Sequence, residues 1–360
     1  MNVLLEGKPE VLDDVGWQII TQSLEKAASE HTHILGLKLT RAVCVQSEFN
    51  RELLTFNYNL MEPLLTIYSK HNRPSNLLLR QWCSTMKALL LSNDTKTGYN
   101  TAPERKRMIA KTKILPSLAS KLHHSDYEHD EKTLNSIVIL LATMAINDDL
   151  SNQIESGHVV QGIHSILKNH FHSGILVRNT ISLLRYLCSS QIVRDKIASY
   201  ALMKWVVEVM ENYKKVEDII EVAMSCCSYM TLRCSCQVAQ LVAKNGLVVI
   251  LQLIKDYKSN VAFLKSACIT LRNMIENGDH EVKQRIKEFY AVVLSELMNQ
   301  LELREYYVRP LLKELELNGE KVETMGEEMV IRPDTVSYEV RIGRKSVVLD
   351  DNTSAENLVA

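Results

Sequence analysis

The sequence has few of the residues that interrupt helices, with 12 glycines and 7 prolines among its 360 residues. It also contains no run of about 18 apolar residues, the length that a bilayer-spanning helix needs. Few turns are therefore obligatory, and no glycine-, serine- or proline-rich linker divides the chain. Because apolar residues still make up 46% of the total, the chain can bury a continuous core. This composition predicts a soluble, all-helical protein.

The charges of the chain nearly cancel, with 42 basic and 43 acidic residues. The summed electrostatic field therefore gives no general attraction for nucleic acid. Eight cysteines are too sparse for a disulfide scaffold, and residues 1–14 lack the basic start and apolar stretch of a secretory signal. We expect a cytoplasmic monomer, with the nucleus as a second compartment, that binds neither nucleic acid nor membrane.

The common nucleotide and hydrolase motifs are missing. The sequence contains neither Gly-x-Gly-x-x-Gly nor a Walker phosphate loop, and no serine stands in a glycine-flanked nucleophile elbow. We therefore expect no enzymatic activity, no catalytic residue and no cofactor.

Instead, three short strings repeat at nearly constant spacing. They are Leu141–Met144, Leu184–Leu187 and Leu271–Met274, with Cys227–Met230 as a weaker copy, and their last residues are 43, 43 and 44 positions apart. A period in the low forties with helical patterning inside each unit is typical of HEAT and armadillo solenoids. The sequence therefore predicts a right-handed armadillo/HEAT-like α-solenoid.

Inside each repeat, a helix with a Leu/Met stripe precedes a break and a second apolar helix. That second helix follows Gly157 in one repeat and Tyr200 in the next, and it begins three residues later than this spacing at Gly246, which predicts a small insertion. The predicted organisation is a solenoid at 1–300 (clearest at 131–300, with a loop insertion at 92–105), a capping helix at 301–317, and a poorly ordered acidic tail at 318–360 with a weak hairpin at 336–349.

Four cysteines, Cys226, Cys227, Cys234 and Cys236, lie within eleven residues. Four thiolates can hold zinc tetrahedrally, although zinc modules pair their cysteines around a turn. Buried free cysteines are also common where helices pack. Structural packing is the preferred interpretation, and a metal- or redox-responsive function is the alternative.

A basic stretch follows the predicted loop and comprises Arg105, Lys106, Arg107, Lys111 and Lys113. It suits a nuclear-import signal or a contact for an anionic partner. It equally suits the solvated face of a helix whose apolar side carries Met108 and Ile109.

The segment Ala267–Met274 is similar to the third helix of an armadillo repeat, in which an apolar frame brackets an asparagine. Residues 130–300 also resemble the armadillo repeat-containing protein six group. The resemblance implies a non-enzymatic scaffold whose third helices line a concave, peptide-binding groove. It transfers the peptide-binding asparagine of the family only to Asn273, since Tyr186 and Tyr229 stand at two of the matching positions.

The groove is expected to carry the residues one and two positions before each repeating Leu or Met. Ser228 also holds such a position, and the candidate partner-binding residues are Arg185, Tyr186, Tyr229, Arg272 and Asn273. Tyrosine and arginine are enriched at binding hot spots because each combines a large contact area with a polar group. The alternative is that the tyrosines pack between helices and the arginines are solvated. The predicted ligand is an extended or helical segment of another protein.

Overall fold

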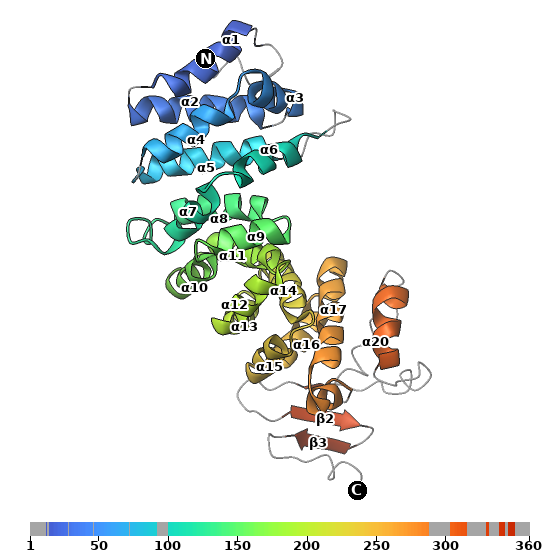
Figure 1. Ribbon diagram of the computed structural model, residues 1–360. Coiled ribbons are helices and arrows are strands. Elements are labelled where there is room, and N and C mark those ends of the chain that lie inside the picture. The colour runs from blue at the N-terminus through green and yellow to red at the C-terminus, as the bar shows by residue number, and fades with distance from the viewer. Residues whose placement is uncertain are drawn as a thin grey trace. The chain divides into compact units, whose positions relative to one another are not determined.

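The computed structural model describes residues 12, 14–27, 29–45, 47–71, 73–91, 100–287, 303–314, 329–330, 338–342 and 345–349. The chain divides into two compact units, Met1–Met230 and Thr231–Ala360. Helices dominate both units (Figure 1).

The described part of unit 1 begins with a helix pair, α1 and α2, and continues with triplets, each with a short first helix, a middle helix and a long third helix. A π-helical turn, η2 (Leu53–Asn57), extends α3, and a 3-10 turn, η3 (Lys121–His123), extends α7. The helices are α1 (Asp14–Glu25), α2 (Glu30–Cys44), α3 (Glu48–Glu52), α4 (Met61–Lys70), α5 (Asn76–Leu90), α6 (Ala102–Ala110), α7 (Ile114–Ser120), α8 (Glu131–Met144), α9 (Asp148–Glu155), α10 (Val159–Asn169), α11 (Gly174–Leu187), α12 (Gln191–Ser199), α13 (Leu202–Asn212) and α14 (Glu217–Thr231), whose last residue falls in unit 2.

The third helices form a row through unit 1, in which α2, α5, α8 and α11 pack side by side in that order (Figure 1). Three of them begin behind a capping side chain, because Ser29, Ser75 and Asp130 each accept a hydrogen bond from the backbone N–H three residues later. Helices α8, α11 and α14 begin at residues 131, 174 and 217, and thus keep the predicted period. The α-solenoid predicted from the repeats is therefore confirmed.

The repeating Leu and Met residues form the core between these helices. Leu141, Met144, Leu184 and Leu187 are all fully buried. Burying one such side chain stabilises a fold by roughly 1.5–3 kcal/mol. The residues that repeat in the sequence are therefore those that hold successive triplets together.

The turns before α10, α13 and α16 each place an L-residue in the left-handed region. The φ angles are 60° at His158, 50° at Ala201 and 53° at Asn245, and each residue directly precedes a middle helix. The three positions are 43 and 44 residues apart, so the turn before α16 lies one residue later than a constant 43-residue period would place it. The insertion predicted before Gly246 is therefore one residue long and not three, because the feature that these turns share is their backbone conformation, which no single residue type marks.

Ala201→Gly is expected to raise the free energy of unfolding by about 1 kcal/mol, because glycine adopts positive φ without the steric cost that alanine meets there. Ala142→Gly, the same change inside helix α8, should lower it by about 1 kcal/mol. Urea denaturation followed by circular dichroism measures both values. A loss of stability in Ala201→Gly would contradict this account of the turn.

Unit 2 continues the repeat with one more triplet, α15 (Ser235–Ala243), α16 (Gly246–Asp256) and α17 (Val261–Asn277). It also contains the turn η4 (Arg304–Val308), α20 (Arg309–Glu314) and three antiparallel strands in the order β1-β2-β3, namely β1 (Met329–Val330), β2 (Tyr338–Ile342) and β3 (Lys345–Leu349). Strands β2 and β3 pair from Tyr338 with Leu349 to Ile342 with Lys345, inside the stretch for which the sequence predicts a hairpin.

Several boundaries predicted from the sequence fall at or beyond the described residues. Helix α6 begins at Ala102, inside the segment predicted as a loop, and residues 92–99 of that segment lie outside the described residues. Most of the predicted tail at 318–360 also lies outside them. In the described part of the chain, no single helix is both long and apolar enough to cross a membrane, whereas α15 and α16, bent by 78° at their junction, pass together on length and composition.

Candidate partner-binding surface

Arg185 and Tyr186 lie on the last turn of α11 and contact each other. The guanidinium carbon of Arg185 is 4.5 Å from the ring centroid of Tyr186, which is a cation–π distance. Arg185 Nη1 also donates a hydrogen bond of 3.3 Å to Ser225 Oγ on α14. Tyr186 is 41% exposed, so its ring is held in place while one side remains open to solvent.

Tyr229 occupies the equivalent position of the next third helix and is 49% exposed. Ser225, which accepts the bond from Arg185, precedes Tyr229 by one helical turn and therefore lies on the same side of α14. The structure thus brings Arg185, Tyr186 and Tyr229 together on one surface of unit 1, here named the α11–α14 face. Ser228, which the sequence places beside Tyr229, is instead buried and donates a hydrogen bond to the carbonyl of Ser225.

Polar bonds that the sequence did not reveal connect the third helices beside this face. Asn179 Nδ2 on α11 donates a 2.7 Å hydrogen bond to Asn135 Oδ1 on α8. Arg178 of α11 forms a 2.9 Å ion pair with Asp218 of α14. The two asparagines are 44 positions apart, close to the repeat period, and this spacing is the signal that could have identified their pairing.

The predicted residues of unit 2, Arg272 and Asn273, differ in accessibility. Arg272 is about half exposed and its Nε forms a 2.9 Å ion pair with Glu276 in the same helix. Asn273 is 3% exposed, and its Nδ2 donates a 3.1 Å hydrogen bond to Thr231 Oγ1. The amide of Asn273 therefore takes part in bonding inside unit 2, and its role as a peptide contact stays a prediction.

The first residue of the predicted basic stretch is part of a buried ion cluster. Arg105 is fully buried, and its Nη1 and Nη2 each lie 3.0 Å from one oxygen of Glu48, which is also buried. Its Nε donates to the carbonyl of Leu89, and Arg51 Nε donates to Glu48 Oε2 at 2.9 Å. The solvated-face and import-signal interpretations were therefore wrong for Arg105, although Arg107 and Lys111 are exposed.

The ionised form of Glu48 is favoured by this cluster. Burial alone would raise the pKa of Glu48, but hydrogen bonds from Arg105 and from the backbone and hydroxyl of Thr101 hold that pKa below its usual value. Because Thr101 and Arg105 follow residues 92–99, the cluster fixes the chain after that segment to α3 and α5.

The four clustered cysteines occupy two different environments. Cys226 and Cys227 are buried in unit 1, where their sulfur atoms lie 3.6 Å and 3.9 Å from the sulfurs of Met230 and Met203, and burial raises the pKa of Cys226. In unit 2, the sulfurs of Cys234 and Cys236 are 3.2 Å apart. Within the described ranges, no three His, Cys, Asp or Glu side chains are grouped as metal ligands.

No protein-family model matches the chain. It is 24% identical over 236 residues to the armadillo repeat-containing protein 6 homolog of Drosophila melanogaster, and 23% identical over 243 residues to armadillo repeat-containing protein 6 of Homo sapiens. Each match covers 65% of this chain, and the chain spans about half the length of these curated relatives.

Solved structures show the same architecture. A β-catenin structure, from work on a phosphorylation switch in the interaction between cadherin and β-catenin, superposes with a TM-score of 0.66 at 14% identity, over 90% of this chain and 61% of that chain. A designed armadillo repeat protein gives 0.58 at 16% identity over 70% of this chain and 99% of the design. The fold is an armadillo fold. The resemblance predicted from Ala267–Met274 and the repeats is confirmed.

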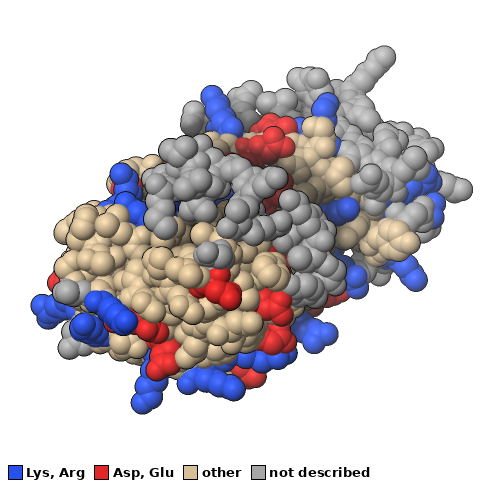
Figure 2. Space-filling model, turned by 90° about the horizontal axis from the view of Figure 1, so that it is seen from above, with Lys and Arg blue, Asp and Glu red and all other residues tan. Residues whose placement is uncertain are grey.

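A further designed armadillo repeat protein, solved in complex with the peptide (KR)4, superposes with a TM-score of 0.56 at 17% identity, over 70% of this chain and 99% of the design. On the face drawn in Figure 2, lysines and arginines are interspersed with aspartates and glutamates, in keeping with the balanced charge of the sequence.

Proposed function

We propose that this protein is a non-enzymatic scaffold that binds a segment of a partner protein through the α11–α14 face. The observation that carries the proposal is the exposure of Tyr186 and Tyr229 at equivalent positions of successive third helices, with Arg185 between the two helices. The armadillo fold supports this proposal. Proteins of this fold include β-catenin, which interacts with cadherin, and a design that binds the peptide (KR)4.

The contacts of Arg185 reduce the entropy that binding must remove. A free arginine side chain loses up to about 2 kcal/mol of rotamer entropy when it is ordered, whereas Arg185 is already restrained by Tyr186 and Ser225. A carboxylate or carbonyl of the partner could accept from the guanidinium while its side chains pack on the two tyrosine rings. Arg272, exposed on α17 of unit 2, is proposed as a further contact, and Asn273 would need a change of its bond to Thr231 to take part.

A cytoplasmic monomer remains the proposal, and nuclear entry has less support because Arg105 is buried. A metal- or redox-responsive function has less support than a scaffold, because Cys226 and Cys227 are packed against methionines. The close sulfurs of Cys234 and Cys236 are the observation that favours it.

In the triple variant Arg185→Ala/Tyr186→Ala/Tyr229→Ala, the captured amount of at least one partner protein is expected to fall by about tenfold or more. The reason is that the variant lacks the arginine and both aromatic contact surfaces. Quantitative affinity capture from a cell lysate, with the bound proteins measured by mass spectrometry, compares it with the unmodified chain. Equal far-UV circular dichroism ensures that both proteins are folded.

The matched control is Ile192→Ala/Lys196→Ala on α12, the first helix of the following triplet, where both side chains are exposed. It should keep all partners. Arg272→Ala tests the contribution of unit 2 separately. Partner lists that are identical for the triple variant and the control would remove the α11–α14 face from the account.

A further inference from the structure

A cavity of about 860 Å³ opens in unit 1 between α4 and the segment formed by α6 and α7. Helices α4 and α7 are the middle helices of successive triplets. At the next such pair, α10 approaches η3 so closely that a Cβ atom on Gly162 would lie 2.5 Å from Leu122 Cβ. Between α4 and α7 the space stays open, and a 3.0 Å hydrogen bond joins the hydroxyls of Tyr68 and Ser117 across it. The size is typical of a ligand-binding site.

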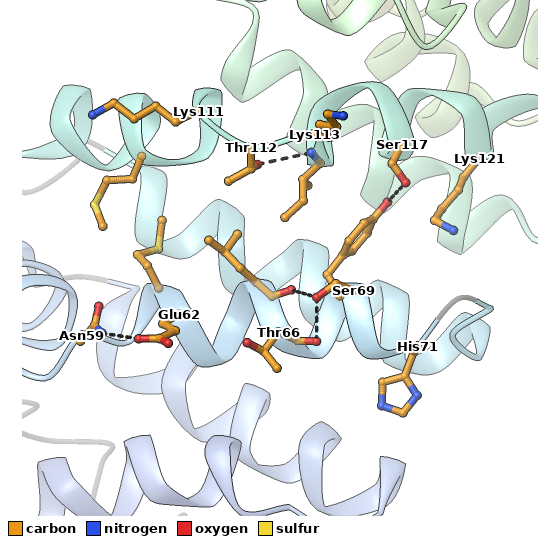
Figure 3. Close-up of a pocket in the computed structure, with 15 residues that line it drawn as sticks. Asn59, Glu62, Thr66, Ser69, His71, Lys111, Thr112, Lys113, Ser117 and Lys121 are labelled. Carbon is orange, nitrogen blue, oxygen red and sulfur yellow. Dashed lines mark hydrogen bonds between the residues drawn. The ribbon is translucent and has the colours of Figure 1, made fainter.

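The two sides of the cavity differ in charge. Lys111, Lys113 and Lys121 all come from the α6–α7 side, whereas α4 contributes Glu62 and the small polar residues Thr66 and Ser69 (Figure 3). Glu62 is engaged locally, since it accepts a 2.7 Å hydrogen bond from Asn59 Nδ2. Among the described carboxylates, none forms an ion pair with any of the three lysines. The cavity therefore has an excess of positive charge, with three lysines against one glutamate among its lining residues.

Lys121 is the most restrained of these cations. Its ammonium lies 5.7 Å from the ring centroid of Tyr68 and 5.3 Å from that of Tyr127. Burial lowers the pKa of Lys121, while Asp126 offsets part of that effect. A half-buried ammonium held by aromatic rings has lost much of its hydration, so an incoming anion would be attracted to it more strongly than to a solvated lysine.

The floor of the cavity is apolar. Met61 and Ile114 are buried, and Leu65 and Met108 are half-buried at its surface. Unbranched methionine side chains adapt to the shape of a neighbour. The cavity therefore combines room for aliphatic side chains with three cations at one edge.

We infer that this cavity is a second interaction site, which binds an acidic peptide segment of a partner protein. Carboxylates of the peptide pair with Lys111, Lys113 and Lys121, and an aliphatic side chain packs on Leu65 and Met108, the half-buried residues of the floor. Among the described residues that line the cavity there is no arginine, so they lack the bidentate fork that favours a phosphate group. In this proposal Lys111 and Lys113, at the exposed end of the basic stretch, bind a ligand independently of the α11–α14 face.

Fluorescence anisotropy tests this site with the full chain and a fluorescein-labelled twelve-residue peptide in which each leucine is flanked by glutamates. The unmodified protein should bind it saturably. Lys111→Glu/Lys113→Glu should weaken binding by about tenfold or more. Lys132→Glu/Lys168→Glu makes the same change in net charge at exposed lysines elsewhere in unit 1 and should change binding by less than about twofold.

Two further arms distinguish the peptide from other anions. Replacing the leucines of the peptide with serine should weaken binding by about tenfold, because the apolar floor then loses its partner. Inorganic pyrophosphate should not displace the peptide at equal concentration. The inference would be overturned by any of four results: no saturable binding, equal weakening by the control variant, unchanged binding of the serine peptide, or displacement of the peptide by pyrophosphate. These measurements do not involve residues of the α11–α14 face, so their failure would leave the proposed function untouched.

Discussion

Arg105→Ala is expected to lower the free energy of unfolding of the protein by about 3–5 kcal/mol, the typical cost of removing one partner from a buried ion pair. The substitution leaves the buried carboxylate of Glu48 without its bidentate partner and removes the bond to the carbonyl of Leu89. It also removes the hydrogen bond that Arg105 Nη1 donates to Thr101 Oγ1, which helps to hold the chain at Thr101. Urea denaturation at pH 7, monitored by circular dichroism, measures the change.

Arg107→Ala is the matched control, because Arg107 stands two positions later, is 71% exposed and forms a surface ion pair with Glu104. It should cost less than about 1 kcal/mol. Acidification gives a second readout. Because the pKa of Glu48 is lowered in the folded protein, its contribution is present above the unfolded-state pKa and is lost as the pH falls through the folded-state value. The stability difference between Arg105→Ala and the unmodified protein should therefore narrow below about pH 5. Equal effects of the two alanine substitutions would contradict the buried cluster.

Gly157→Ala is expected to destabilise unit 1 by about 2–3 kcal/mol, through overpacking against a backbone that cannot easily move. A Cβ atom at this position, in the turn between α9 and α10, would overlap the main chain of Pro116 and lie 2.7 Å from its carbonyl carbon. Pro116 is inside α7, so relief of the clash requires α7 and α10 to separate. Thermal or urea denaturation detects a change of this size.

Gly174→Ala provides the control for this prediction. A Cβ atom on Gly174 would first meet side-chain atoms of Tyr213 and Ile219, at 3.3 Å and 3.4 Å, and these can shift. Gly174 is also the first residue of α11, where alanine is the better helix former. The change should stay within about 0.5 kcal/mol of zero. A Gly157→Ala protein as stable as Gly174→Ala would contradict the tight packing of α7 against the turn.

The solenoid could be predicted because its signal is local and repeated. Leu141, Met144 and Leu184 are buried at positions that recur with the repeat period, and each repeat supplies an independent copy of the pattern. The Glu48–Arg105 pair gives no such signal, because the two residues are 57 positions apart and Arg105 stands in a run of lysines and arginines that resembles a solvated helix face. Only packing of α6 against α5 distinguishes it from Arg107.

The sequence predicts which residues of the candidate surface stand at equivalent repeat positions, but it does not predict which of their side chains are exposed. The period placed Tyr186 and Tyr229 at equivalent positions, yet it gave the same weight to Ser228 and Asn273, which are buried. The angle at which a third helix packs decides which of two adjacent residues faces solvent, and that angle depends on side chains of neighbouring helices. The cavity beside Lys111 and Lys113 depends on the separation of α4 and α7, for which the sequence pattern has no measure.

The central claim, that the α11–α14 face binds a partner, is tested most directly by site-specific photocrosslinking in cells. A benzophenone amino acid replaces Tyr186, Tyr229 or, as the control, Ile192 on α12, which is exposed but outside the face. The account predicts that residues 186 and 229 crosslink to the same partner and that residue 192 does not. Crosslinks from residue 192 alone, or different partners at 186 and 229, would contradict it.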